Sequence, residues 1–428
     1  MAPPVTAAPP RDAAATGLSR LLAAMPDGQP VGASLADHLR VHGQLPPRGA
    51  RLIDEIGAAG LTGRGGAAFP AARKISAVRA AGRGAVAVAN GAEGEPASRK
   101  DVALLWLAPH LVLDGLQAAA EACGARTAIL YVHAGQPALL GRLQHSLAER
   151  ELRGVEVIEA PARFLAGEET ALVARVGGGA AVPGYKEHRV FERGIGGRPT
   201  LVQNVETLAH IGLIARHGAG WFRRAGTPAE PGSALATLHE ADGSWRVAEV
   251  ALGTPISQLL RLDDRVQAVL AGGYHGGWLS AGQARGLRLS NADLRPAGSF
   301  VGAGVLAALP ADVCGLAEVA NVARYLALES AGQCGPCLNG LPRIAAALTA
   351  VARPLPAPAE LADLRRWSGL VTGRGACHHP DGTVRFVTSA LRVFAAEIAE
   401  HARGRCTATA AGPFLPMAAV PAAEPDWR

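Results

Sequence analysis

Residues 85–96 read AVAVANGAEGEP, a short apolar run followed at once by a loop with one amide and two carboxylates. The run is one of three apolar segments with the length of strands, at 85–89, 127–133 and 155–158. Amphipathic helical patterns lie before and between these segments, at 51–59, 102–122 and 137–150. Alternation of this kind predicts a mostly parallel sheet covered by helices, so we expect an α/β fold.

The pattern changes twice farther along the chain. With 428 residues, 49% of them hydrophobic, the chain is long enough for about three domains. After an expected helix at 202–216, short strand patterns begin, and beyond 298 helical patterns dominate, the last at 384–402. We therefore expect five regions: a mobile N-terminal segment (1–45), an α/β domain (46–225), a small α+β module (226–298), a helical domain (299–405) and a mobile tail (406–428).

The net charge of +6 comes almost wholly from arginine, because lysine occurs only at Lys74, Lys100 and Lys186. The basic residues are dispersed, aromatic residues make up 4% of the chain, and no nucleic-acid motif is present, so we expect no nucleic-acid partner. In a chain that uses arginine nearly everywhere, a lysine inside a motif suggests that a compact ammonium group is needed there.

Three features bear on the compartment. No run reaches the ~18–20 consecutive apolar residues of a membrane helix, and the first residues lack the pattern of a secretory signal. The six cysteines are too few for a disulfide framework in a chain of this size. These features predict a cytoplasmic protein with no direct membrane insertion.

A glycine-rich loop precedes the first strand. Its candidate ligand residues are Gly63, Arg64, Gly65, Gly66, Phe69 and Lys74. Glycines let backbone N–H groups approach an anion, and the two basic side chains can add charge-assisted bonds, so the loop is a candidate phosphate site. The loop has neither of the common phosphate-binding fingerprints, and a plain tight turn is an equal alternative.

Three further motifs carry amides and carboxylates. Their candidate ligand residues are Asn90, Glu93 and Glu95 after the first strand, Gly167, Glu168 and Glu169 at the start of a helix, and Gln203 and Asn204 at the start of another. Ligands bind at the carboxyl ends of strands in open α/β sheets, so the first motif is placed to hold sugar hydroxyls, a flavin edge or a nicotinamide amide. Taken singly, the three motifs also fit a solvated turn, helix-dipole compensation and helix capping.

Cysteines form the last motif, with Cys334 and Cys337 in a Cys-Gly-Pro-Cys pair and Cys377 forty residues downstream. Two thiols at this spacing can converge on one metal, because the Gly and Pro between them bend the backbone. The pair follows a helix and a third thiol is available, which favours a metal site over a dithiol redox pair. Three buried cysteines acting as small hydrophobic residues are the alternative.

In this order, the motifs resemble the flavin-bearing, NADH-oxidising subunit of respiratory complex I, a family that includes diaphorase subunits of NAD-linked hydrogenases and formate dehydrogenases. The resemblance runs from about residue 51 to 403. It implies a Rossmann-like flavin-binding domain, a β-grasp (ubiquitin-like) module and a C-terminal helical bundle with an iron–sulfur cluster. It further implies an NADH dehydrogenase-type flavoprotein whose partners are NADH and a ferredoxin-like or other electron-transfer subunit.

The resemblance also assigns residues. The Gly-rich loop and Lys74 would hold FMN, Phe69 is the aromatic residue that the loop keeps, and Glu95 would orient the nicotinamide. The Gly167–Glu169 and Gln203–Asn204 motifs would complete the pocket for FMN and NAD(H). Cys334, Cys337 and Cys377 would hold a [4Fe-4S] or [3Fe-4S] cluster.

Several family positions are changed in this chain. Ala68 replaces a loop glycine, Ala77 an adenine-stacking aromatic residue, Ala92 an aspartate, and Ala331 the first cysteine of the cluster motif. These changes motivate a second hypothesis, a binding or scaffold protein that kept the fold and lost turnover. In that case Cys334, Cys337, Cys377 and His378 would hold a structural zinc ion.

Overall fold

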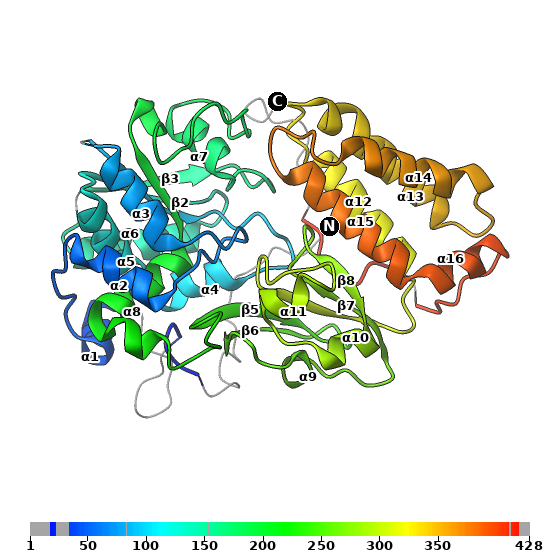
Figure 1. The fold of residues 1–428 in the computed structure, drawn as a ribbon, viewed down its shortest axis with the longest axis horizontal. Helices are drawn as coiled ribbons and strands as arrows, with labels where there is room; N and C mark the ends of the chain where they lie inside the picture. Colours follow the sequence, from blue (N-terminus) through cyan, green and yellow to red (C-terminus); the bar gives the residue numbers. More distant parts are fainter. Residues whose placement is uncertain (1–17, 23–33, 83, 153, 411, 419–428) are drawn as a thin grey trace.

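The computed structural model describes residues 18–22, 34–82, 84–152, 154–410 and 412–418. A parallel sheet with its helices, a mixed sheet and a group of helices lie side by side (Figure 1). The mixed α/β fold expected from the sequence is confirmed.

The first sheet has four strands, β1 (Val86–Gly91), β2 (Thr127–His133), β3 (Val155–Ala160) and β4 (Thr200–Asn204), in the order β3-β2-β1-β4. All its pairings are parallel. Successive side chains of β1 point to opposite faces, as the two-residue period of a strand requires. Ala87 and Ala89 join one core cluster, whereas Val86 and Val88 join another.

Helices cover both faces of this sheet. The core that contains Ala87 and Ala89 also contains side chains of α2 (Arg51–Ala59), α3 (Ala71–Ala80), α5 (Pro109–Cys123) and α8 (Val205–Phe222). The core that contains Val86 includes α7 (Glu169–Val176) and the short helix η1 (Ile195–Gly197). The remaining helices of this part are α1 (Leu35–His42), α4 (Lys100–Leu107) and α6 (Pro137–Glu149).

Two helices expected in this part of the chain are wrong in detail. The helix expected at 102–122 is two helices, α4 and α5, bent by 96° at a break where Pro109 begins α5. The helix expected at 202–216 begins later, because residues 200–204 form β4, which pairs with β1. Among the described residues no single helix is long and apolar enough to cross a membrane, and α4 and α5 pass that test only as a bent pair.

The second sheet contains β5 (Ser233–His239), β6 (Trp245–Ala251), β7 (Val266–Ala271), β8 (Gly277–Ser280) and β9 (Val305–Pro310), in the order β6-β5-β9-β7-β8. β9 pairs in parallel with β5 inside an otherwise antiparallel sheet, as in a β-grasp module. Three short helices accompany it, α9 (Ile256–Leu259), α10 (Ala281–Gly286) and α11 (Asn291–Leu294). Because β9 lies beyond residue 298, we propose that this module extends to residue 310.

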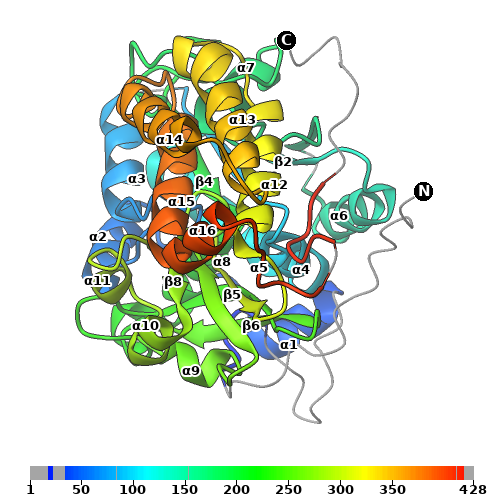
Figure 2. The ribbon, with the colours of Figure 1, turned by 90° about the vertical axis from the view of Figure 1, so that its right-hand side faces the viewer.

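The last part is helical. Its elements are α12 (Gly315–Leu328), the short helix η2 (Pro336–Gly340), α13 (Leu341–Val351), α14 (Pro358–Val371), α15 (His379–Val393) and α16 (Ala395–Ala402). α12 packs against α13 and α15, and α14 packs against α13, as Figure 2 shows from the side. The helix expected at 384–402 is two helices that break at Phe394.

Parts of the two segments expected to be mobile pack onto the body. The backbone N–H groups of Arg20 and Leu21 donate to the buried Glu249 carboxylate at 2.8 and 2.7 Å. Near the other end, the N–H groups of Phe414 and Leu415 donate to Glu318 at 2.8 and 3.0 Å. Residues 1–17, 23–33, 411 and 419–428 of those segments lie outside the described residues.

Candidate functional site

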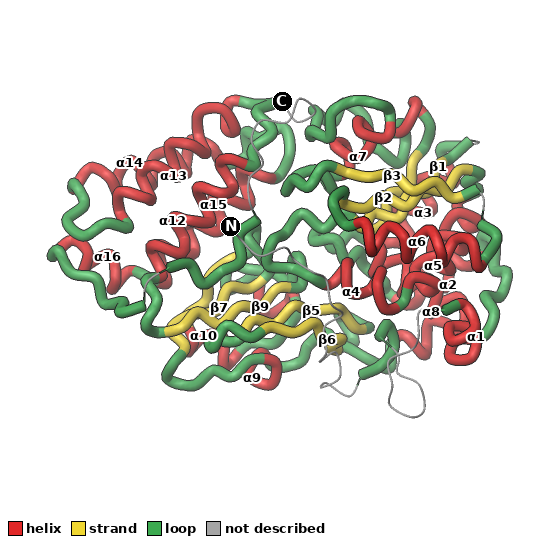
Figure 3. The backbone as a smooth tube through the Cα atoms, turned by 180° about the vertical axis from the view of Figure 1, so that it is seen from behind, coloured by secondary structure: helices red, strands yellow, loops and turns green. Residues whose placement is uncertain are grey.

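A cavity of about 800 Å³ lies where the three parts meet, next to α4, which sits between the two sheets (Figure 3). The predicted site residues that line it are Arg64, Gly65, Gly66, Asn90, Glu93, Glu95, Gly167, Glu168, Asn204 and Cys377. Those that lie outside its lining are Gly63, Phe69, Lys74, Glu169, Gln203, Cys334 and Cys337. One cavity therefore collects residues from all four motifs and one cysteine of the fifth.

Close backbone approaches shape the cavity wall. A Cβ atom on Gly94 would lie 2.1 Å from the Phe164 carbonyl oxygen, and one on Gly167 would lie 2.3 Å from the Ala92 carbonyl oxygen. Both positions therefore exclude a side chain. Asn90 joins the same two loops, since its side-chain amide donates to the Gly167 carbonyl at 2.8 Å. The glycines of the two acidic motifs thus bring residues 92–95 and 164–168 together.

Glu95 links the parallel sheet to the mixed sheet. Its carboxylate accepts hydrogen bonds from the backbone N–H groups of Tyr274 at 2.7 Å and Ala97 at 3.2 Å. Burial raises its pKa to about 7, because an ionised carboxylate loses its hydration there. Burial also raises the pKa of Glu93, whose carboxylate accepts from the Ser98 hydroxyl and from the Lys100 and Asp101 N–H groups at the start of α4.

All three lysines pair with carboxylates of the motifs or their neighbours. Lys186 lies 2.9 Å from both Glu168 and Glu169, and Lys74 lies 3.4 Å from Glu169. Burial acts to raise the pKa of Glu169, but the two lysines outweigh it and the pKa is lowered. The rarity of lysine in the sequence was therefore a usable signal for this region.

Lys100 is buried beside the cavity. Its ammonium group lies 2.6 Å from Asp101 and 2.9 Å from Glu206. Burial lowers its pKa, but Asp101, Glu206 and Glu93 together raise it above the usual value. The Asn204 side-chain amide donates to Asp101 at 2.6 Å, and its oxygen caps α8. Lys100 therefore stays protonated next to the cavity, with its charge compensated by Asp101 and Glu206.

Arg64 does not offer its guanidinium group to the cavity as the sequence suggested. Its side chain donates to the backbone carbonyls of Ser233 and Thr62, at 3.0 to 3.2 Å. Its backbone N–H donates to the Thr207 hydroxyl at 2.9 Å. Arg64 therefore fixes the loop to β5 and α8, and the loop reaches the cavity through Gly65 and Gly66.

Three other predicted residues lie at the margins of this region. Phe69 is 40% exposed, with the Arg73 guanidinium 5.7 Å from its ring. Gln203 lies on β4 and not on a helix, and its buried side-chain nitrogen has no hydrogen-bond partner among the described residues. Gly63 donates to the Phe69 carbonyl at 2.8 Å and closes the loop.

The far wall of the cavity contains residues that the sequence motifs did not indicate. These include His275, Arg295, Phe300, His379 and Arg385. The rings of His275 and His379 are joined at 2.9 Å, and burial lowers the pKa of both. They come from the mixed sheet and from α15, so only the three-dimensional fold brings them to the motifs.

The three predicted metal ligands lie together at the helical side. Burial raises the pKa of Cys337 to about 12 and that of Cys377 to about 11, and the charge of Cys334 acts on both. Among the described residues, no set of three drawn from Cys334, Cys337, Cys377 and His378 has its ligand atoms within 4.8 Å of one another. The His378 side chain is 94% exposed, and Ala331 is buried against Leu165.

A single zinc ion requires four ligand atoms about 3.3–3.8 Å apart, given zinc bonds of 2.0–2.3 Å. At least two of the three sulfur atoms lie farther apart than that, because the three do not all lie within 4.8 Å of one another. An iron–sulfur cluster is several atoms across and spreads its cysteine ligands farther apart. The thiol set therefore fits a cluster better than it fits the zinc site of the second hypothesis.

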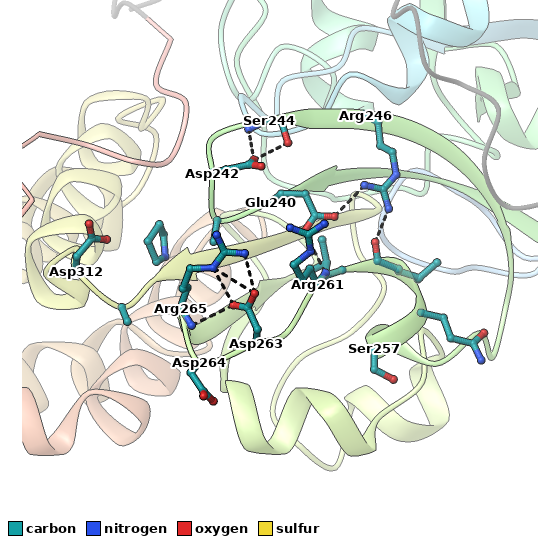
Figure 4. Close-up of a pocket in the computed structure, with 16 residues that line it drawn as sticks. Glu240, Asp242, Ser244, Arg246, Ser257, Arg261, Asp263, Asp264, Arg265 and Asp312 are labelled. Carbon is teal, nitrogen blue, oxygen red and sulfur yellow. Dashed lines mark hydrogen bonds and ion pairs between the residues drawn. The ribbon is translucent and has the colours of Figure 1, made fainter.

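A second cavity, of about 740 Å³, lies on the mixed sheet beside α9 (Figure 4). Charged side chains in it pair with one another, Arg246 with Glu240 at 2.9 Å and Arg265 with Asp263 at 2.7 Å. It contains none of the predicted site residues. The first cavity is therefore the candidate site.

Two regions of the chain match protein-family models. Residues 56–213 match the Nuo51 FMN-binding domain, and residues 317–401 match the iron–sulfur binding region of NADH-ubiquinone oxidoreductase F. The first region contains all four motifs of the cavity, and the second contains the three cysteines.

Similar proteins span most of the chain. It is 28% identical to an F-type NADH-quinone oxidoreductase subunit of Rhizobium meliloti (strain 1021), over 83% of this chain and 89% of that protein. It is 27% identical to the F-type NADH-quinone oxidoreductase subunit of Streptomyces coelicolor (strain ATCC BAA-471 / A3(2) / M145), over 83% of each.

Among solved structures, the NAD⁺-reducing [NiFe]-hydrogenase in its H₂-reduced state matches with a TM-score of 0.75 and 26% identity. The match covers 82% of this chain and 62% of the hydrogenase chain. This chain thus spans less than two thirds of the length of that hydrogenase chain.

Proposed function

Because the chain belongs to the family of flavin-bearing, NADH-oxidising subunits of respiratory complex I, we propose that it oxidises NADH and passes the electrons through FMN to an iron–sulfur cluster and a partner carrier. One observation carries this proposal. The cavity joins the Gly-rich loop, the acidic motifs, Asn204 and Cys377, so residues proposed for the flavin and the nicotinamide and one proposed cluster ligand share a single site.

FMN fits the residues on the parallel-sheet side of the cavity. Gly65 and Gly66 expose backbone where a side chain would fill space, and Lys100, paired with Asp101 and Glu206, lines the same cavity. We propose that this loop holds the flavin phosphate and that Asn90 and Asn204 contact the flavin. A single phosphate-type loop without a dinucleotide fingerprint favours FMN over FAD. When bound, the flavin supplies the conversion of a two-electron step into one-electron steps.

Glu95 is the proposed residue for the nicotinamide. Its carboxylate is fixed by two backbone N–H groups, which orient it without neutralising it. Glu168 and Glu169 would line the nucleotide side, and Lys74 and Lys186 hold those two carboxylates in place. NADH is the expected substrate, because the family oxidises NADH.

Cys334, Cys337 and Cys377 are the proposed cluster ligands. Three thiolates can bind three of the four iron atoms of a [4Fe-4S] cluster or all three iron atoms of a [3Fe-4S] cluster. The position of the first family cysteine is Ala331, which offers no ligand atom. The fourth corner of a cubane would then belong to water or to a residue outside the motif.

The names of the relatives support assembly with other electron-transfer subunits. We propose a ferredoxin-like or similar one-electron carrier as the partner, because a cluster passes electrons singly. The cytoplasmic location expected from the sequence stays a prediction. The scaffold hypothesis is not favoured, because the thiol spacing does not suit one zinc ion and the family models match both cofactor regions.

The test is anaerobic purification followed by acid extraction of the flavin. We expect a yellow-brown protein that releases FMN. Release of mostly FAD would contradict the choice of flavin. A colourless protein that takes up no added FMN would contradict the proposed function as a whole.

A further inference from the structure

Four potential metal ligands meet at the opposite end of α12 from the cluster cysteines. They are Cys314, Glu397, His401 and Cys406, and one ligand atom from each lies within 4.8 Å of every other. Cys314 is the N-cap of α12, Glu397 and His401 lie one turn apart on α16, and Cys406 follows α16. Among the described residues this is the group compact enough for a single ion.

Two of the contacts already have lengths close to those of a tetrahedral metal centre. The His401 Nε2 atom lies 3.7 Å from the Cys314 Sγ atom and 3.0 Å from a Glu397 carboxylate oxygen. Ligand atoms around a tetrahedral zinc ion lie about 3.3–3.8 Å apart, given zinc bonds of 2.0–2.3 Å. A small adjustment of the remaining contacts closes the set around one ion.

Neighbouring groups hold two of the ligands in position. The Cys314 sulfur accepts the Ala317 N–H group in the first turn of α12. Burial outweighs this contact and raises the pKa of the thiol to about 11, so the bound cation itself would have to stabilise the thiolate. The Glu397 carboxylate accepts the hydroxyl and the N–H group of Thr407, which hold it in place. Such outer contacts orient ligands in metal sites.

We propose that Cys314, Glu397, His401 and Cys406 form a closed structural site for Zn²⁺, separate from the site of electron transfer. On binding, each thiol loses a proton to solvent, and the ion gains two sulfur ligands, one nitrogen ligand and one oxygen ligand. Four protein ligands leave no open position for substrate, so the role is structural. α12 has 14 residues, about 21 Å at 1.5 Å per residue, and separates this set from Cys334.

The site would fix the chain that follows α16. Beyond Cys406, Phe414 and Leu415 donate to Glu318, and the Tyr274 hydroxyl donates to the Pro416 carbonyl. The Tyr274 N–H group binds Glu95 in the cavity. A zinc ion at Cys406 would therefore anchor a segment that packs behind the proposed nicotinamide residue.

The test measures zinc in the full-length chain, expressed with added Zn²⁺ and purified anaerobically under reducing conditions. Replacing Cys334, Cys337 and Cys377 with serine removes the other thiol set, so that retained zinc reports on this site. We expect about one zinc ion per chain in that background, as in a four-ligand structural site. A further Cys406→Ser change should weaken zinc binding by at least ~100-fold, the upper end for loss of even an outer-shell partner.

Cys123→Ser is the matched control, because Cys123 is a cysteine on α5 outside both thiol sets. It should leave zinc binding unchanged. If the triple background does not fold, Co²⁺ added to the otherwise unaltered chain replaces the zinc measurement. Tetrahedral cobalt–thiolate absorption should then appear and be lost in Cys406→Ser.

Three outcomes would overturn the proposal. They are equal zinc content with and without Cys406, no uptake of zinc or cobalt by the reduced chain, and a Cys314–Cys406 disulfide in the protein purified under reducing conditions. The last would mean that the two sulfurs meet as a redox pair and not as metal ligands.

Discussion

At the scale of single residues, Glu95 has the properties of a carboxyl group that gains or loses a proton near neutral pH. It is buried, its pKa is raised to about 7 by that burial, and two backbone N–H groups hold its orientation. Loss of hydride leaves a positive charge on the nicotinamide ring, which an ionised carboxylate nearby stabilises. The charged form of Glu95 is therefore the one that favours the proposed reaction.

We predict that the rate of flavin reduction by NADH rises with pH through about 7, as the Glu95 carboxyl ionises. Glu95→Gln should slow reduction and flatten this dependence while flavin content stays close to normal. Stopped-flow absorbance at a series of pH values measures both. An unchanged pH profile in the variant would show that another group titrates.

The same pKa shift has a consequence for stability. The folded chain keeps the Glu95 proton at pH values where the unfolded chain, with a pKa of 4.5, has lost it. Its contribution to stability is thus fully present below pH 4.5 and is lost as the pH rises from 4.5 to about 7. Glu95→Gln should reduce the fall in unfolding free energy over that range.

At the scale of elements, α5 and α8 cross so closely that one contact admits only glycine. A Cβ atom on Gly115 would lie 1.8 Å from the Leu208 carbonyl oxygen, so backbone would have to move. Gly212 lies in the same contact, 3.3 Å from the Asp114 Cβ atom if given a Cβ of its own. Side chains of these two helices share a core cluster with β1, so they support the strand that carries the acidic loop.

We predict that Gly115→Ala lowers the unfolding free energy by more than ~2 kcal/mol, in the range of overpacked cores. Gly141→Ala is the control, because Gly141 is exposed within α6 and a Cβ atom there meets nothing within 4 Å. That change should instead add about 0.5–1 kcal/mol through helix propensity. Urea unfolding compares the two, and equal effects would contradict the argument.

The elements also show where sequence reasoning succeeds. Strongly periodic segments such as α2 and β2 lie within a residue or so of their expected positions, because local pattern determines them. β4 and β9 were missed because each is a short segment defined by its pairing, β4 with β1 and β9 with β5 and β7. The break between α4 and α5 had a visible signal in Pro109, whereas the break at Phe394 had none.

For the site, the motifs indicated the right loops but not the role of every residue in them. Arg64 carries the charge expected of a phosphate ligand, but its side-chain N–H groups donate to the backbone carbonyls of Ser233 and Thr62. Ser233 lies 169 residues away in the sequence. Cys314 and Cys406 are 92 residues apart in the sequence. They lie close in space because α16 folds back to the start of α12. Such contacts depend on tertiary packing that spacing does not encode.

At the scale of the whole molecule, three differently built parts contribute to one cavity. The parallel sheet supplies the loop after β1, the mixed sheet supplies the Tyr274 N–H group that holds Glu95, and the helical part supplies Cys377. The proposed flavin residues and the proposed cluster ligand Cys377 therefore border the same cavity. Electrons can pass from the flavin to the cluster without crossing another part of the chain. Loss of the cluster should separate the two half-reactions.

We predict that anaerobic preparations show an iron–sulfur signal by electron paramagnetic resonance after NADH is added. Cys337→Ser should abolish this signal while flavin content and flavin reduction by NADH persist, because Cys337 lies outside the cavity lining. With Ala331 in place of a fourth cysteine, the signal should also disappear faster in oxygen than that of a four-cysteine cluster. Cys123→Ser, which removes a buried thiol on α5, should leave it unchanged.

The measurement is best made in a Cys406→Ser background, so that zinc at the second thiol set does not enter the metal analysis. Iron and sulfide present with Cys337 and absent without it would assign the cluster to the Cys334, Cys337 and Cys377 set. One equivalent of zinc without iron or sulfide in that background would contradict the assignment. The flavin half of the proposal would then need an acceptor other than a cluster in this chain.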